Sequence, residues 1–554
     1  MTRRMKRIFY ILMAVLMLSS CETSWLDESK HPMPDGVGTT PEFVFEGEST
    51  ITVNKLGGDY TASIKANQPW LIESTVSWIT VTSDRVGKGD GTSETVNFTV
   101  EKNPGLEPRE GKIRMWITND HEAFIIIKQE PLLLEDLGSD WFVTVSGTGD
   151  GSSWASPTTL SKALAAAVDA DKIYVAAGTY IPEDVIPGGA PGGDETFFVK
   201  ANVSIVGGFP ANPKDGDVAD PVNNPVVISG NDVCYHSIVL GAPKSELFSV
   251  KLSGLTITKG KSHTTATQVP INGGVTYKSY GGGMTISGGR NFIENCNIIG
   301  NYSEKSNAGV YLTGGAETTF RNCRISENSG KGNGCGLWNG PNCVTYMYNC
   351  EIARNTTTGV GSAIYNYEVT LGNGAPSLYM ANCEVTGNSA GSFGAIYCRS
   401  SNMVVVNCTI HGNSSKKGAA ISVYGDGAIL NLVSSTVTAN TGSQTAVVWA
   451  ESKGKLNLYN SVVAGNTDPT NSDAAGYEKA EKSLIGGGLS MFGAYNAGVY
   501  PLLSGAGLNG GMTIDELKSV NTAIATMPLI PEDVEVDQKG NKRSGSKMGA
   551  YVGN

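Results

Sequence analysis

The stretch that decides the fold runs from Asn295 to Asn466, where a seven-residue phrase returns at a nearly constant interval. It reads NCNIIGN at 295, NCRISEN at 322, NCEIARN at 349, NCEVTGN at 382 and NCTIHGN at 407, followed by the weaker copies SSTVTAN at 434 and NSVVAGN at 460. Successive copies start 27, 27, 33, 25, 27 and 26 residues apart. A repeat of this length is typical of a solenoid, in which each copy forms one unit stacked on the next.

Two further apolar columns travel with the phrase. One consists of Met284, Val310, Leu337, Ile364, Ile396, Ile421 and Val448, and the other of Ile293, Phe320, Met347, Met380, Val405, Leu432 and Leu458. Around each column apolar and polar residues alternate, which favours strands over helices. Three short strands per period without a helical crossover predict an all-β fold, a right-handed parallel β-helix whose coils stack at about 4.8 Å.

The phrase also predicts where the coil turns. Cys296 and Ile298 are two residues apart and share the inward face, whereas Ile293 lies three residues before Cys296, so the alternation slips at Asn295 and indicates a corner. The last Asn of each phrase should stack as an amide ladder at the next turn. The cysteines of the repeat are 25 to 33 residues apart and match no C-x-x-C pattern, so we expect buried thiols and no metal site.

The N-terminus predicts an exported protein. Four basic residues within the first seven precede an apolar run at 8–18 and then Ser19, Ser20 and Cys21. This arrangement is typical of a signal peptide at 1–20, and Leu18-Ser19-Ser20-Cys21 resembles a bacterial lipobox, which implies lipid attachment at Cys21. Residues 21–40 are expected to be a tether. The acidic residues after Cys21 resemble the export signal of Bacteroidetes surface lipoproteins, which implies an outer-membrane protein exposed at the cell surface.

Residues 41–131 show short alternating strands separated by turn signals, which predicts a β-sandwich. This segment resembles the BACON domain of Bacteroidetes proteins, a family associated with carbohydrate-binding and carbohydrate-degrading surface proteins. The resemblance is carried by Trp70, Trp78, Asn103, Arg109 and Gln129. We expect the two tryptophans to be core residues of the sandwich.

The β-helix is expected to span 139–510, with a capping helix at 158–168 and a closing segment at 511–554. The repeats resemble those of polymorphic outer-membrane adhesins and the pectin-lyase-like superfamily. Enzymes of that superfamily carry clustered carboxylates or a basic residue. The nearest approach here is Arg324, Glu351 and Glu384 at one outward position, which we interpret as a solvated row of charges. We therefore assign no catalytic residue, cofactor or metal.

One outward column is unusual because it is aromatic. The residues Tyr311, Trp338, Tyr365, Tyr397 and Trp449 follow the inward Val, Leu or Ile of successive coils. An open row of rings would suit the apolar faces of sugars, unless an inserted loop or the C-terminal tail covers it. We expect a surface protein that binds polysaccharide or host glycan without catalysis. The alternatives are a polysaccharide lyase and a structural spacer. The net charge of −11 argues against a nucleic-acid partner.

Overall fold

The chain forms two compact units, Met1–Asp136 and Leu137–Asn554. The computed structural model describes residues 40–105, 107–118, 120–131, 133, 137–263, 267–271, 274–367, 374–487, 510–520, 527–543 and 545–550. Cys21 and the expected signal peptide and tether lie outside the described residues. Among those that are described, no helix is both long enough and apolar enough to cross a bilayer.

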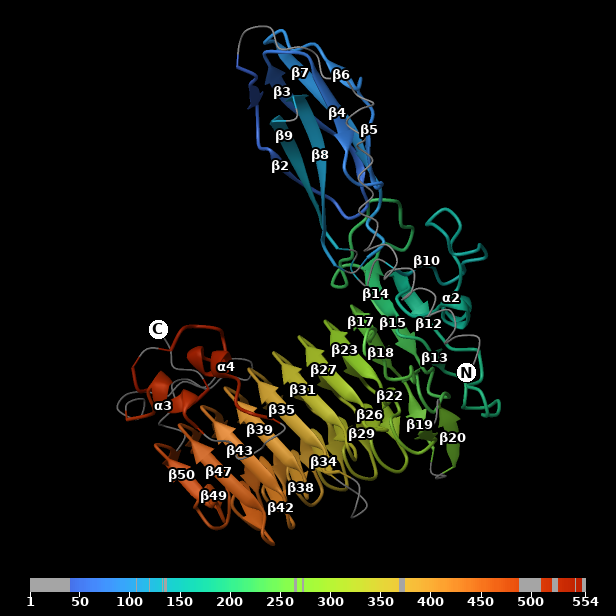
Figure 1. Ribbon diagram of the computed structural model, residues 1–554. Coiled ribbons are helices and arrows are strands. Elements are labelled where there is room, and N and C mark those ends of the chain that lie inside the picture. Colours follow the sequence, from blue (N-terminus) through green and yellow to red (C-terminus); the bar gives the residue numbers. More distant parts are fainter. Residues whose placement is uncertain are drawn as a thin grey trace. The chain divides into compact units, whose positions relative to one another are not determined.

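The first unit is a β-sandwich of two sheets (Figure 1). One sheet has the order β1 (Phe43–Phe45), β3 (Gly58–Ala66), β7 (Ser93–Val100) and β5 (Ile79–Val81). The other has the order β2 (Thr50–Val53), β9 (His121–Gln129), β8 (Arg109–Thr118), β4 (Trp70–Ser74) and β6 (Val86–Gly87). The predicted β-sandwich is therefore present; its strands pair antiparallel, except that β2 pairs with β9 in parallel.

The second unit is the expected parallel β-helix, with four sheets where three were predicted (Figure 1). We call the twelve strands from β10 (Asp140–Val143) to β50 (Lys479–Glu481) sheet 1, and the eleven from β12 (Gly178–Tyr180) to β51 (Leu484–Ile485) sheet 2. Sheet 3 has ten strands from β13 (Phe197–Val199) to β49 (Ala474–Ala475). The additional sheet 4 has seven two-residue strands from β19 (Lys261–Ser262) to β45 (Thr441–Gly442). Six of them are the extended dipeptides that directly follow the last Asn of a phrase.

One coil shows how the repeat builds these sheets. It passes through β27 (Glu317–Arg321) of sheet 1, β28 (Arg324–Ser326) of sheet 2, β29 (Ser329–Gly330) of sheet 4 and β30 (Leu337–Asn339) of sheet 3. The predicted corner between the first two strands is present, since Asn322 has φ of 52°. Asn is one of the residues that tolerates this left-handed conformation, which explains why Asn opens the phrase.

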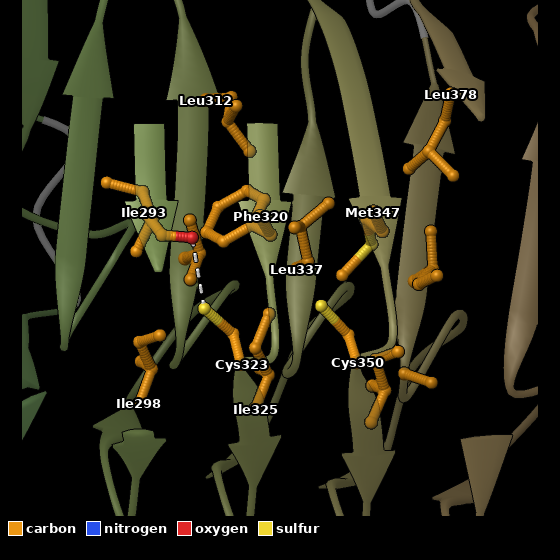
Figure 2. Packing of buried hydrophobic residues seen from close by; sticks show 14 of the residues in the cluster. Ile293, Ile298, Leu312, Phe320, Cys323, Ile325, Leu337, Met347, Cys350 and Leu378 are labelled. Carbon is orange, nitrogen blue, oxygen red and sulfur yellow. Dashed lines mark hydrogen bonds between the residues drawn. The ribbon is translucent and has the colours of Figure 1, made fainter. Parts of the chain in front are cut away.

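The inward side chains of all coils form one continuous apolar core. Figure 2 shows Ile293, Phe320 and Met347 of sheet 1 beside Cys323 and Cys350, which come from the corner before sheet 2. The thiol of Cys323 donates a hydrogen bond to the Ile293 carbonyl oxygen, with 3.2 Å between Sγ and O. All nine cysteines of the described residues are buried and unpaired, which confirms the prediction of buried thiols.

The predicted amide ladder is present. It consists of Asn301, Asn328, Asn355, Asn388, Asn413, Asn440 and Asn466, in which each Nδ2 donates to the Oδ1 of the next residue at 2.9–3.0 Å. Each Oδ1 after the first also accepts the backbone N–H of the preceding Asn, at 2.9–3.1 Å. The ladder therefore satisfies buried backbone groups at the turn between sheets 2 and 4.

Non-repeating segments close the solenoid. At its start α2 (Leu160–Ala166) buries Leu160, Ala163 and Leu164 in the interior, as expected for a cap. Near its end α3 (Ile514–Lys518) and α4 (Pro531–Glu535) lie beside the last strands of sheet 1 (Figure 1). They contribute Leu517 and Val534 to an apolar layer on the outer face of that sheet. The buried Arg543 side chain fastens this C-terminal segment, because its Nη2 donates to Asn407 Oδ1 at 2.8 Å.

Candidate functional site

The aromatic column has the register that the sequence predicted. Tyr311 lies beside Trp338, Trp338 beside Tyr365 and Tyr365 beside Tyr397 on paired strands of sheet 3. These strands are β26 (Val310–Thr313), β30, β34 (Ile364–Tyr367) and β38 (Ile396–Arg399). The column then continues through Ser422 of β42 (Ile421–Tyr424) to Trp449 of β46 (Val448–Glu451).

Four of the five rings of this column are covered, as in the alternative that the sequence left open, and do not form an open row. Tyr311, Trp338, Tyr365 and Tyr397 are only 5%, 6%, 3% and 3% exposed. Their rings contact one another, with centroids 5.0–5.6 Å apart. Burial raises the pKa of Tyr397 to about 12 and moves the pKa values of Tyr311 and Tyr365 in the same direction. These four residues therefore form a small second core, and only Trp449 is half-buried.

Segments outside the regular coils cover the inner rings at the start of the column. The insertion at 261–279 contains a hairpin of β20 (Gln268–Ile271) and β21 (Gly274–Tyr277). Tyr277 ends this hairpin and Tyr280 follows it. The Tyr280 ring lies 5.3 Å from that of Tyr311 and 5.1 Å from that of Trp338. The aromatic insertion thus takes the place that a ligand would need.

Further along the column a half-buried aromatic layer lies over and beside the inner rings. Its members, which we call the outer aromatic layer, are Tyr367, Phe393, Tyr424 and Trp449. Phe393 contacts Tyr397 with ring centroids 5.3 Å apart and is stacked on Trp449 at 5.9 Å. The regular pattern pointed to Trp449 but not to the other three, because Phe393 lies in a turn and the two tyrosines occupy a neighbouring column.

Two cations accompany the outer aromatic layer. The Arg399 guanidinium lies 4.7 Å from the Tyr367 ring centroid and 5.4 Å from that of Tyr424. The Lys417 ammonium lies 5.6 Å from the Phe393 centroid and 5.2 Å from that of Trp449. Such cation–π contacts hold the rings in defined orientations. The face therefore presents aromatic surface together with hydrogen-bond donors, which is suited to a ligand that has both apolar faces and oxygen atoms.

The outward charges on sheet 2 are brought together as a row. Arg324 of β28 pairs with Glu351 of β32 (Glu351–Ala353), with 3.2 Å between Nε and Oε2, and Glu351 lies beside Glu384 of β36 (Glu384–Thr386). His411 is a neighbour that the sequence analysis left unassigned, and its Nε2 lies 2.6 Å from Glu384 Oε1. Within the described residues no group of three or more His, Cys, Asp or Glu side chains could hold a metal ion.

The motif residues of the sandwich have structural roles. Trp70 is 3% exposed and belongs to the core, as expected, and the Arg109 guanidinium lies 4.0 Å from the ring centroid of Trp78. Gln129 accepts a hydrogen bond from Arg109 Nε at 2.7 Å and donates to the Asn54 and Glu101 carbonyl oxygens at 3.0 and 2.9 Å. The buried Asn103 joins the Glu107 and Glu130 carbonyl oxygens in the same way. These residues therefore fasten loops together.

Comparisons with solved structures find similarity to several chains, three of which are a xyloglucanase, a pectate lyase and an MSP family member. A Bacteroides ovatus GH5 xyloglucanase in complex with a XXXG heptasaccharide is 18% identical, over 26% of this chain and 38% of its own, with a TM-score of 0.15. The pectate lyase Pel9A is 12% identical, over 76% of this chain and 92% of its own, with a TM-score of 0.36. The C. elegans MSP family member WR4 is 13% identical, over 15% and 93%, with a TM-score of 0.13. This chain thus spans well under half of the xyloglucanase.

No curated protein matches the chain. Two family models do match it, and they correspond to the two units. The model described as "Right handed beta helix region" matches residues 249–468. The BACON model, described as "Putative binding domain, N-terminal", matches residues 68–130. The chain therefore carries a BACON domain in its first unit and a right-handed β-helix region in its second.

Proposed function

We propose that this protein binds polysaccharide or host glycan at the cell surface, anchored in the outer membrane through a lipid on Cys21. The observation that carries the proposal is the outer aromatic layer, in which half-buried rings and two cations lie together on one face of sheet 3. Sugar rings offer apolar C–H faces for the aromatic rings and hydroxyl groups for Arg399 and Lys417. Aromatic surface of this kind on a monomer marks an interaction site.

The family description of the first unit, "Putative binding domain, N-terminal", makes the BACON domain the other possible place for the sugar contacts. Because Trp70 is buried and Arg109 covers Trp78, we place the sugar contacts on the β-helix and give the BACON domain the role of a spacer between the anchor and the β-helix.

A glycan array probed with the full-length protein tests this proposal. Replacing Trp449 or Tyr424 with Ala should weaken binding about tenfold or more, because exposed aromatic anchors contribute a large share of binding energy. The matched control is Tyr477→Ala, since Tyr477 is 42% exposed and lies outside the layer. Trp338→Ala is unsuitable because Trp338 is buried. Binding that is the same in both layer variants as in the wild type would refute the proposal.

A polysaccharide lyase is the alternative function, and the row of Arg324, Glu351 and Glu384 on sheet 2 is the observation in its favour. A lyase would release unsaturated uronates from acidic polysaccharides, which raises the absorbance of the solution. If this signal appears with the wild type and is lost in Arg324→Ala, the enzyme is favoured. If no glycan binds and no product forms, the remaining reading is a structural spacer.

A further inference from the structure

A polar groove lies on a different part of the β-helix from the outer aromatic layer. It is bounded by two coils of sheet 2 on one side and by a turn of the C-terminal segment on the other, and its volume is about 460 Å³. Its polar lining consists of Asn349, Glu351, Asn382, Glu384, Gln538 and Lys539. The volume is within the range of roughly 300–1,000 Å³ that is usual for small-molecule sites.

The wall made by the C-terminal segment is fixed in place. Gln538 is 6% exposed, and its Nε2 donates a hydrogen bond to the Cys383 carbonyl oxygen at 2.8 Å. Its Oε1 accepts a hydrogen bond from the hydroxyl of Thr409. The turn that carries Lys539 is closed by the buried Asp537, whose Oδ1 accepts the backbone N–H groups of Lys539 and Asn541, each at 2.9 Å. The groove therefore exists before a ligand binds.

The floor of the groove contains two carboxylates side by side. Glu351 and Glu384 are paired in register on adjacent strands, an arrangement that is destabilising unless other groups offset the repulsion. Arg354 Nη2 lies 3.3 Å from Glu351 Oε1, and His411 Nε2 lies 2.6 Å from Glu384 Oε1. The Glu351 and Glu384 side chains remain 36% and 24% exposed, so they can still accept hydrogen bonds.

The groove also has an acceptor without a partner. The Oδ1 atom of Asn382 is shielded from solvent and accepts no hydrogen bond from any described residue. The groove thus combines the carboxylates of Glu351 and Glu384 and the side-chain amides of Asn349, Asn382 and Gln538 with the ammonium group of Lys539. Arg354 and Lys539 together offset the charges of Glu351 and Glu384, which favours a ligand without a net charge. Such a ligand must supply O–H donors to the carboxylates.

We propose that this groove binds a neutral saccharide, as a site separate from the outer aromatic layer. Hydroxyl groups of the sugar donate to Glu351 and Glu384, which are partly exposed, and Lys539 donates to a sugar oxygen. Since none of the described residues that line the groove is aromatic, we expect recognition by hydrogen bonds rather than by stacking. This inference does not depend on the function proposed for sheet 3.

Saturation-transfer NMR on the full-length protein tests the inference. The probes are glucose, galactose, mannose, xylose and their β-linked tetramers, with tetragalacturonate as the acidic comparison. Glu384→Gln keeps the shape of the side chain, and Lys539→Ala alters only an exposed position of the turn. Each should weaken binding of the neutral probe about tenfold, the effect of losing a charged hydrogen-bond partner.

Two further variants separate the possible outcomes. Glu294→Gln is the control, because Glu294 is likewise an outward glutamate with a basic partner, Arg321, is 45% exposed and lies outside the groove. Trp449→Ala removes a ring of the outer aromatic layer. Both should bind the neutral probe as the wild type does. The inference is overturned if the wild type binds no neutral probe, if tetragalacturonate binds better, if the groove variants bind normally, or if Trp449→Ala has the same effect as they do.

Discussion

The amide ladder allows a stability prediction that can be worked out atom by atom. Asn388 is fully buried, and its Nδ2 donates to the Ile352 and Thr386 carbonyl oxygens and to Asn413 Oδ1 at 2.9, 3.0 and 3.0 Å. Its Oδ1 accepts both the backbone N–H and the Nδ2 of Asn355 at 2.9 Å. Asn388→Ala removes all of these bonds and leaves the buried backbone N–H of Asn355 without its acceptor. At roughly 1 kcal/mol for each hydrogen bond, the free energy of unfolding should fall by about 3–5 kcal/mol.

Urea denaturation followed by far-UV circular dichroism measures this loss. Asn297→Ala is the control, because Asn297 occupies an exposed position in another copy of the phrase and should change stability by less than about 0.5 kcal/mol. Asn388→Asp keeps the side-chain shape but places a carboxylate opposite three oxygen atoms, so it should cost at least as much as the alanine variant. A loss below about 1 kcal/mol in Asn388→Ala would show that the ladder does not stabilise the coils as argued.

Two other predictions concern ionisable groups in the interior. Burial lowers the pKa of His236 from 6.5 to about 4, so between these pH values only the unfolded chain binds the proton. The free energy of unfolding should be constant above about pH 6.5 and decrease by about 3 kcal/mol as the pH falls to 4. A pH series of denaturation curves measures this decrease, and His236→Gln should remove it. Burial also raises the pKa values of Cys335 and Cys398 to about 12. A thiol reagent should leave the nine buried cysteines of the folded protein unmodified and label all of them in urea, as measured by mass spectrometry of the protein. Rapid labelling of Cys335 in the folded protein would contradict this packing.

The repeating part of the fold could be predicted from the sequence because a solenoid translates sequence period directly into vertical register. The spacing of Asn301 and Asn328 alone indicates that their amides stack, and the slip before Cys323 indicates the corner at Asn322. Sheet 4 was not predicted, since its strands contain only two residues and two residues carry no alternation. The repeat period therefore specifies which residues of successive coils are neighbours, but it does not predict strands of only two residues.

The candidate sites could be predicted only in part. The register of Tyr311 with Trp338 followed from the period, but their burial did not, because Tyr280 reaches them from an insertion that has no counterpart in other coils. The groove could not be predicted at all, because it is formed by segments far apart in the chain. Gln538 donates a hydrogen bond to the carbonyl oxygen of Cys383, 155 residues earlier. Contacts between a unique segment and a repeat produce no pattern in the chain, so sequence reasoning has no signal from which to find them.

This difference suggests how binding and stability are divided in the molecule. In the repeat, each outward side chain lies between side chains at the equivalent position of the neighbouring coils. The repeat by itself therefore forms a regular surface. Both candidate sites depend on a residue outside that regularity, Phe393 in a turn for the outer aromatic layer and Lys539 in the C-terminal segment for the groove. Substitutions such as Lys539→Ala should therefore change ligand affinity with little effect on unfolding. Substitutions in the ladder, such as Asn388→Ala, should lower stability and leave the affinity of the folded protein unchanged.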